Sequence, residues 1–178
     1  TVISLSIGQG ELGCTPLQMA NMVATVANRG HYRIPHVVKR IHDRDSIDAR
    51  FYEDHHTKVD ARHFDPIVEG MYKAVNEGGT GRIAMVPGLD ICGKTGTAQN
   101  PHGADHSTFF CFAPRNDPKI AVSVYVENGR FGATIAAPIA SLLTELYLTD
   151  TITRPALVDY VKNMQIAYPY YEKQRKGK

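Results

Sequence analysis

Three stretches of alternating side-chain character follow one another closely between Leu89 and Glu127. A period of two is typical of β-strands, and it predicts strands at 89–98, 107–113 and 119–127. The connections are short: one loop rich in Gly, Pro, Asn and His, and one turn with the sequence Pro-Arg-Asn-Asp-Pro. Parallel strands need a crossover of a dozen or more residues, so the pattern predicts an antiparallel three-strand meander.

Segments with helical signals surround the predicted meander. Thr15-Pro16 begins a run with one apolar face that stops at Gly30, which indicates a capped helix. A second capped helix is expected from Asp65-Pro66 to Gly78-Gly79, a long apolar helix over 132–148, and a short one over 155–163. The sequence therefore predicts an α+β fold in which helices cover an antiparallel sheet.

The domain organisation follows from the same pass along the chain. Residues 43–63 are polar, charged and without a period, so we interpret them as a surface insertion. Residues 1–150 are expected to belong to one domain, and 151–178 to form a terminal helix and a basic tail. Histidines in the insertion are interpreted as solvated loop residues, because adjacent histidines do not present two nitrogens to one ion. These are His55, His56 and His63.

Composition excludes several classes of function. The 178 residues carry a formal charge of +2 and are 43% hydrophobic and 21% charged, which is typical of a globular protein rather than a disordered one. The last basic run, Lys173 to Lys178, contains no aromatic residue, so no nucleic-acid partner is predicted. Cys14, Cys92 and Cys111 form no metal or disulfide pattern and are expected to pack as small hydrophobic residues. No cofactor and no metal are predicted.

One motif has two interpretations. Gly88–Thr95 matches the phosphate-binding pattern G-x-x-x-x-G-K-[ST] at every specified position. That motif requires a loop that opens a helix, whose amides then bind phosphate. Thr95 is instead followed by Gly-Thr-Ala-Gln-Asn-Pro, which is a poor start for a helix. Nucleotide binding therefore stays as the less favoured alternative.

The favoured interpretation places Lys94, Thr95, Gly96 and Thr97 within a strand. Alternation then directs Lys94 and Gly96 to one face of the sheet and the two threonines to the other. A glycine inside a strand often marks the close approach of another backbone or a ligand. An extended segment with a lysine and two hydroxyls can bind a carboxylate and add a peptide as a further strand. Taken alone, these residues are also compatible with an ordinary edge strand.

Three segments together carry a family resemblance. They are Gly8–Glu11 with Thr15–Ala20, then Gly93–Gln99, and then His106–Pro114. In order and approximate spacing they resemble class B penicillin-binding proteins, and the likeness extends from near Ser4 to Leu148. The first segment most resembles the members that serve cell elongation, with the division transpeptidases a close second.

The resemblance implies a penicillin-binding-protein/β-lactamase-like transpeptidase fold and a D,D-transpeptidase activity. In this family a serine attacks the D-Ala-D-Ala bond of a peptidoglycan stem peptide, and an amine then takes the acyl group; β-lactams bind at the same place. Lys94 would hold positive charge against the substrate carboxylate and the hydroxyl of the family's S-x-N motif. Thr95 and Thr97 would offer hydroxyls to that carboxylate, and the Thr97 backbone amide would be one oxyanion donor.

The chain departs from the family in lacking two of its three motifs. None of the six serines has a lysine three residues later or an asparagine two residues later. We therefore expect the C-terminal part of a transpeptidase domain without its nucleophile, inactive alone because nucleophile and base act as a unit. A second interpretation is a non-catalytic module that holds peptide or β-lactam without chemistry.

Expectations about surroundings also come from the resemblance. The whole protein would be anchored in the inner membrane, with this domain on the periplasmic side and the cell-elongation machinery as its partner. The predicted helix at 15–29 would lose part of its apolar cover in this chain. We therefore expect the chain on its own to self-associate or to be less stable.

Overall fold

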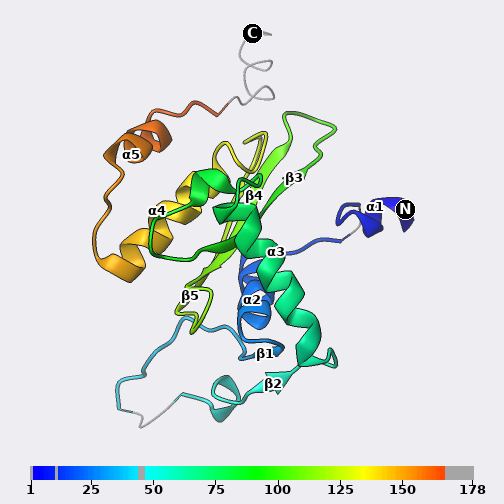
Figure 1. Ribbon diagram of the computed structural model, residues 1–178. Coiled ribbons are helices and arrows are strands. Elements are labelled where there is room, and N and C mark those ends of the chain that lie inside the picture. Colours follow the sequence, from blue (N-terminus) through cyan, green and yellow to red (C-terminus); the bar gives the residue numbers. More distant parts are fainter. Residues whose placement is uncertain (1, 11, 44–46, 167–178) are drawn as a thin grey trace.

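A three-stranded antiparallel sheet forms the centre of the computed structural model, which describes residues 2–10, 12–43 and 47–166 (Figure 1). The strand order is β3-β4-β5, so both connections are between neighbours and the predicted meander is confirmed. The first strand begins at Cys92, three residues later than expected, because the chain turns at Gly88 and Asp90, which both have positive φ. The strands are β3 (Cys92–Ala98), β4 (His106–Ala113) and β5 (Ile120–Val126).

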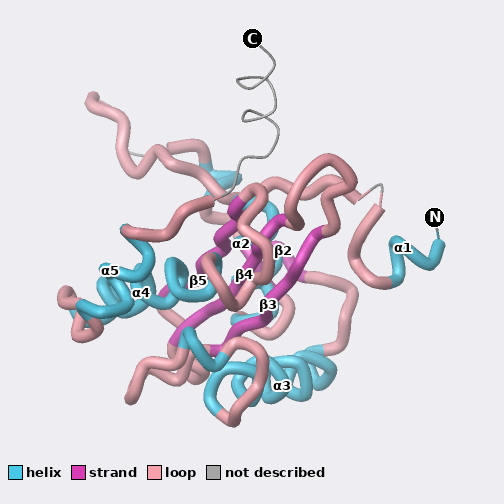
Figure 2. Tube along the Cα trace, turned by 90° about the horizontal axis from the view of Figure 1, so that it is seen from above, coloured by secondary structure: helices cyan, strands magenta, loops and turns pink. Residues whose placement is uncertain are grey.

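Helices cover both faces of this sheet, which confirms the α+β class. Helix α4 (Ala136–Thr149) packs on one face, where Phe109 and Cys111 of β4 meet the alanines of its first two turns. Helices α2 (Pro16–Ala27) and α3 (Phe64–Asn76) pack on the other, where Cys92 and Phe112 are buried. Figure 2 shows α3 beside β3 and α4 beside β5.

Helix α2 begins as its sequence predicts. The Thr15 hydroxyl accepts a hydrogen bond from the backbone N–H of Gln18, and the Gln18 side chain accepts one from the backbone of Thr15. This reciprocal capping box satisfies two amides that the first turn leaves unpaired. The helix ends at Ala27, and the next turn places Gly30 at a φ of 109°, which favours glycine.

The start of α3 differs from the prediction. The helix begins at Phe64, before Asp65-Pro66, and no side chain caps it. The reason is a short 3-10 helix, η2 (Ala61–His63), that runs directly into α3 and is itself capped by the Asp60 carboxylate. The predicted stop is confirmed, because α3 ends at Asn76 and the following Gly78 has a φ of 82°.

Helix α4, in contrast, starts later than expected, at Ala136 rather than at residue 132. The residues before it form a loop that lies against β3 and β4, so they are not free to be helical. The short terminal helix, α5 (Pro155–Lys162), agrees with its predicted range within one residue. The basic tail, with Lys173, Arg175, Lys176 and Lys178, lies outside the described residues.

The segment 43–63 contains regular structure that the sequence did not predict. Strand β2 (His55–His56) pairs with β1 (His31–Tyr32), and η1 (Ala49–Phe51) precedes it. The interpretation of His55 as a solvated loop residue was wrong, since its Nε2 is buried and its ring stacks on Tyr32. His56 is exposed. A short helix, α1 (Val2–Ser6), was also not predicted.

Two of the three cysteines pack as expected. Cys92 and Cys111 are fully buried, and burial raises the pKa of each thiol to about 12, so both stay protonated at neutral pH. Cys14 is exposed in the segment that leads into α2, so the packing prediction was wrong for that residue. Among the described helices, none combines the length and the apolar character that crossing a bilayer requires.

Candidate functional site

The Lys-Thr-Gly residues lie within β3, at an edge of the sheet. Within the described ranges β3 pairs with β4 alone, and Lys94 faces Phe110 across the ladder while Thr97 faces Ser107. The strand continues beyond Thr95 to Ala98, so no helix begins after the lysine. A phosphate-binding loop requires that helix. The nucleotide interpretation was therefore wrong, and the strand interpretation is the one the structure adopts.

Lys94 projects from the face of the sheet on which α2 and α3 pack. It lies two residues after Cys92, which is buried in the α2–α3 cluster, and residues two apart in a strand share a face. The Lys94 side chain is itself exposed, and its Nζ donates a hydrogen bond to the carbonyl oxygen of Thr95 at 2.7 Å. The lysine charge is thus held beside the strand at the rim of a covered face.

Two neighbours of the strand were not assigned a role by sequence reasoning. The hydroxyl of Thr95 is 2.8 Å from that of Thr80, which follows α3. The side-chain amide of Gln9 donates to the Thr97 carbonyl oxygen at 3.3 Å. Gln9 lies in a segment that carries the family resemblance, which gives a signal for it. Nothing in the local sequence around Thr80 identifies its partner.

The backbone contacts indicate which residues of β3 face its open edge. The carbonyl oxygens of Thr95 and Thr97 both accept hydrogen bonds from side chains rather than from a neighbouring strand: Thr95 from Lys94 of the same strand, and Thr97 from Gln9. In an antiparallel strand the N–H and C=O of one residue point to the same side, and residues two apart share that direction. The N–H groups of both threonines are therefore directed toward the edge where a further strand could pair.

Close packing on the sheet explains the glycine of the motif. A Cβ at Gly96 would lie 2.5 Å from Cγ2 of Thr108 on the neighbouring strand. A Cβ on Gly132, in the loop before α4, would lie 2.5 Å from the Gly96 carbonyl oxygen. Gly132 therefore lets the loop rest on the backbone of β3, and Gly96 leaves room for the side chain of Thr108.

The face that carries Lys94 is covered over only part of its length. The cluster formed with α2 and α3 includes Cys92 and Phe112, and Phe110 is packed at its margin. Gly96, further along β3, and Thr108 opposite it are half-buried, whereas Cys92 and Phe112 are fully buried. Beyond the end of β3 lies a cavity of about 620 Å³, lined by Ser4, Gln9, Gln99, Asn100 and Asp105.

These features define a class of protein. An antiparallel sheet between helices, with Lys-Thr-Gly on the edge strand, is the arrangement of the penicillin-interacting serine enzymes. A family model described as the penicillin binding protein transpeptidase domain matches residues 2–145. The chain belongs to this transpeptidase family.

Similar proteins narrow the group within the family. The chain is 35% identical over 170 residues to the peptidoglycan D,D-transpeptidase MrdA of Acinetobacter baumannii. This match covers 86% of the chain and 25% of that protein. The chain is 37% identical over 147 residues to the peptidoglycan D,D-transpeptidase PbpA of Mycolicibacterium smegmatis, which covers 75% of this chain and 29% of that protein. The chain thus spans about a quarter of the length of such relatives.

Solved structures that resemble this chain also include penicillin-binding proteins. The penicillin-binding protein 2 (PBP2) of Pseudomonas aeruginosa, in complex with WCK 5153, has a TM-score of 0.71 and 35% identity, covering 93% of this chain and 34% of that one. The imipenem acyl-enzyme of penicillin-binding protein A from Mycobacterium tuberculosis has a TM-score of 0.65 and 33% identity, covering 80% and 33%. PBP2 belongs to the subgroup that the first segment of the chain most resembles.

Proposed function

We propose that this chain forms the C-terminal part of a peptidoglycan D,D-transpeptidase and supplies the strand that binds its substrate. The observation that carries this proposal is the geometry of β3, where Lys94 lies beside the strand and the backbone groups of Thr95 and Thr97 face its open edge. A stem peptide that ends in D-Ala-D-Ala would pair there as a further strand. β-Lactams would bind at the same edge.

Each residue of the motif then has a chemical role. A serine oxygen attacks the carbonyl carbon of the penultimate D-Ala, the terminal D-Ala leaves with a proton, and an amine of a neighbouring stem peptide later displaces the serine. Lys94 balances the substrate carboxylate, and the hydroxyls of Thr95 and Thr97 donate to it. The Thr97 N–H, directed toward the edge, donates to the oxyanion.

The nucleophile would come from the rest of the transpeptidase domain. The open half of the face that carries Lys94 is where such a lobe would pack, which would bring a serine and its lysine base beside the strand. A non-catalytic binding module is less well supported, because the relatives described above are named as D,D-transpeptidases.

The setting of the whole protein is part of the proposal. A transpeptidase of this kind would act on the periplasmic side of the inner membrane, anchored by a segment outside this chain, together with the cell-elongation machinery. The similarity to MrdA and to PBP2 supports the elongation assignment. Residues 1–150 would be the transpeptidase portion, and 151–178 a terminal extension.

Acylation of the whole protein by a fluorescent penicillin tests the role of the strand. Lys94→Ala should lower the second-order acylation rate about 100-fold, because the positive charge that holds the carboxylate of the penicillin beside the strand is lost. Lys162→Ala, at an exposed position of α5, is the matched control and should leave the rate unchanged. An unaltered rate in Lys94→Ala would contradict the assignment.

A further inference from the structure

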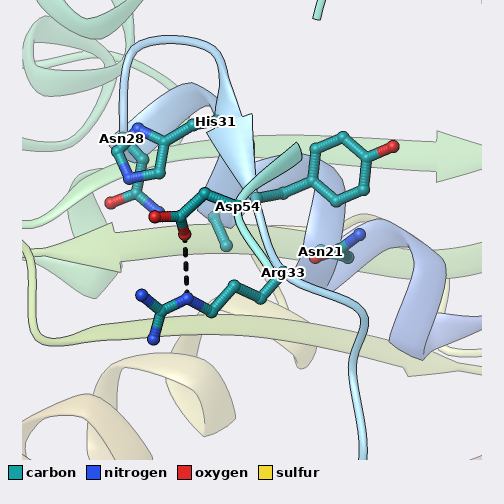
Figure 3. A pocket seen from close by; sticks show the side chains of 7 residues that line it. Asn21, Asn28, His31, Arg33 and Asp54 are labelled. Atoms are coloured by element: carbon teal, nitrogen blue, oxygen red, sulfur yellow. Dashed lines mark hydrogen bonds and ion pairs between the residues drawn. The ribbon is translucent and has the colours of Figure 1, made fainter. Parts of the chain in front are cut away.

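A second hollow lies between α2 and the β1–β2 pair (Figure 3). Its volume is about 370 Å³, which falls within the range of roughly 300–1,000 Å³ that is usual for small-ligand sites. It shares no lining residue with the cavity beyond β3 or with the Lys-Thr-Gly motif. Six of its lining residues are polar: Asn21, Asn28, His31, Tyr32, Arg33 and Asp54.

The polar groups of this hollow retain unused hydrogen-bonding capacity. Arg33 donates from Nε to Oδ1 of Asp54 at 2.8 Å, and this bond leaves the two terminal nitrogens of the guanidinium and the second carboxylate oxygen available. Within the described part of the chain, the side-chain amides of Asn21 and Asn28 make no hydrogen bond to another protein atom. Figure 3 shows the bond between Arg33 and Asp54, and it shows both asparagines among the lining side chains.

The charge of the hollow favours an uncharged ligand. Arg33 and Asp54 form an ion pair, so their formal charges cancel, and no other lining residue is an Asp, Glu, Lys or Arg. Planar amide and carboxylate groups can each bond two adjacent hydroxyls. A ligand rich in hydroxyls and without formal charge fits this set of donors and acceptors.

Helix α2, which carries Asn21 and precedes Asn28, is fixed in place by its packing. Asn21 and Asn28 are seven residues apart, so they lie on one side of α2 and its cap, about 10 Å apart along the axis. The opposite side of α2 is held by Val23 and Ala27, both buried against the sheet. Tyr32 adds an aromatic ring, which stacks on His55 with 5.3 Å between ring centroids. An aromatic ring beside hydrogen-bonding groups suits a ligand with apolar and hydroxyl faces.

We propose that this hollow binds one or two sugar units of a glycan strand. The identification of that strand as the peptidoglycan backbone rests on the function proposed above, because the stem peptide of a transpeptidase substrate is attached to such a glycan. A sugar contact separate from Lys94 would hold the strand while its peptide reaches β3. The site therefore adds polymer recognition to the enzyme and takes no part in the acyl transfer.

The test uses the whole protein after acylation with penicillin, so that the transpeptidase site is blocked. Di-N-acetylchitobiose is titrated, and saturation-transfer NMR measures its binding. We expect saturable binding that Asn21→Ala weakens at least fivefold. Asn163→Ala, at the end of α5 and outside the hollow, is the matched control and should bind as the unmodified protein does. Alanine is the best helix former, so Asn21→Ala should not impair folding of α2.

Two results would overturn the sugar site: absence of saturable binding, or binding that neither Asn21→Ala nor Asp54→Ala weakens. Cellobiose has the same frame without acetamido groups and should bind more weakly; equal binding would contradict the assignment to peptidoglycan. Acylation by penicillin is measured in the same samples. A protein that binds the disaccharide but is not acylated would contradict the transpeptidase proposal alone.

Discussion

Single residues determine how the loop before α4 meets the substrate strand. Gly132 lies against the backbone of Gly96 and Thr108, and any Cβ at this position would lie far inside van der Waals contact of the Thr108 carbonyl oxygen. Backbone atoms on two paired strands cannot shift independently of the sheet. The tolerance of this position for a side chain is therefore lower than that of glycines with open space around them.

Gly132→Ala should lower the free energy of unfolding by about 2 kcal/mol, as overpacking in a well-packed region does. Gly70→Ala is the matched comparison, because Gly70 lies inside α3 with no atom within 4 Å of an added Cβ. That change should raise stability by about 0.5–1 kcal/mol. Urea denaturation of both variants measures the difference. Equal effects of the two substitutions would contradict the packing described for Gly132.

At the scale of single residues, the sequence predicts where the Lys-Thr-Gly motif lies better than it predicts which residues contact the motif. The position of Lys94, Thr95, Gly96 and Thr97 in a strand follows from local alternation and from their order relative to other segments. The Thr95–Thr80 contact does not, because it joins residues that tertiary packing alone brings together. The same holds for the sugar-site residues, which come from α2 and its C-terminal cap, from β1 and the residue after it, and from Asp54 before β2.

Among the elements, α4 and the segment before α5 are joined by a buried ionic cluster. Glu145 of α4 is 1% exposed and accepts hydrogen bonds from the backbone and hydroxyl of Thr153, at 2.9 and 2.6 Å, and from Nε of Arg154 at 2.9 Å. Arg154 also donates to the Ser141 hydroxyl at 2.8 Å. The cluster fixes the chain that follows α4 against that helix.

Glu145→Gln should destabilise the protein by about 3 kcal/mol at neutral pH, because it leaves the Arg154 charge without its partner. Burial opposes ionisation of Glu145, but the hydrogen bonds from Thr153 and Arg154 outweigh it and hold the pKa of this carboxyl below its usual value. A lowered pKa stabilises the folded state above the usual pKa, and this stability is lost as pH falls through the folded value.

The stability difference between the unmodified chain and Glu145→Gln should therefore be full at pH 6 and shrink below about pH 4. Urea denaturation at a series of pH values measures it. Asp159→Asn, at an exposed site on α5, is the control and should show little difference at any pH. A difference for Glu145→Gln that is constant from pH 6 to pH 3 would contradict the ionic role of this residue.

The success of prediction at this scale depends on how local the signals are. α2 was predicted from Thr15, Pro16 and Gly30, whose effects act within one turn of the helix. The start of α3 was misplaced because η2 supplies the preceding turn, and that of α4 because its predicted first residues pack on the sheet. The β1–β2 pair contains two residues in each strand, too few to show a period.

For the molecule as a whole, the fold leaves apolar side chains of two helices exposed to solvent. Leu17 and Met22 of α2 are 57% and 44% exposed, and apolar residues of α1 are exposed as well. Helix α2 packs on the face of the sheet against which we propose that the rest of the domain packs. Sequence patterns predicted the α+β class and the meander, but the extent of cover depends on tertiary contacts that no local pattern reports.

This chain on its own should self-associate at micromolar concentrations, because extended apolar surface is rarely left in water. Leu17→Glu with Met22→Glu should shift it toward monomer in sedimentation velocity. Val37→Glu with Val59→Glu changes two exposed apolar residues in other segments and should leave association unchanged. A monomeric unmodified chain, or equal effects of the two double variants, would contradict this role of α2.

The central claim is that β3 belongs to a serine acyl-transfer site whose nucleophile lies outside residues 1–178. Intact mass spectrometry after incubation with penicillin tests it most directly, on this chain alone and on the whole protein. The account predicts no adduct on this chain, and one adduct per molecule of whole protein on a serine outside this segment, since no serine here has a lysine one helical turn away. A stoichiometric adduct on this chain, lost when one of its six serines is replaced, would contradict it.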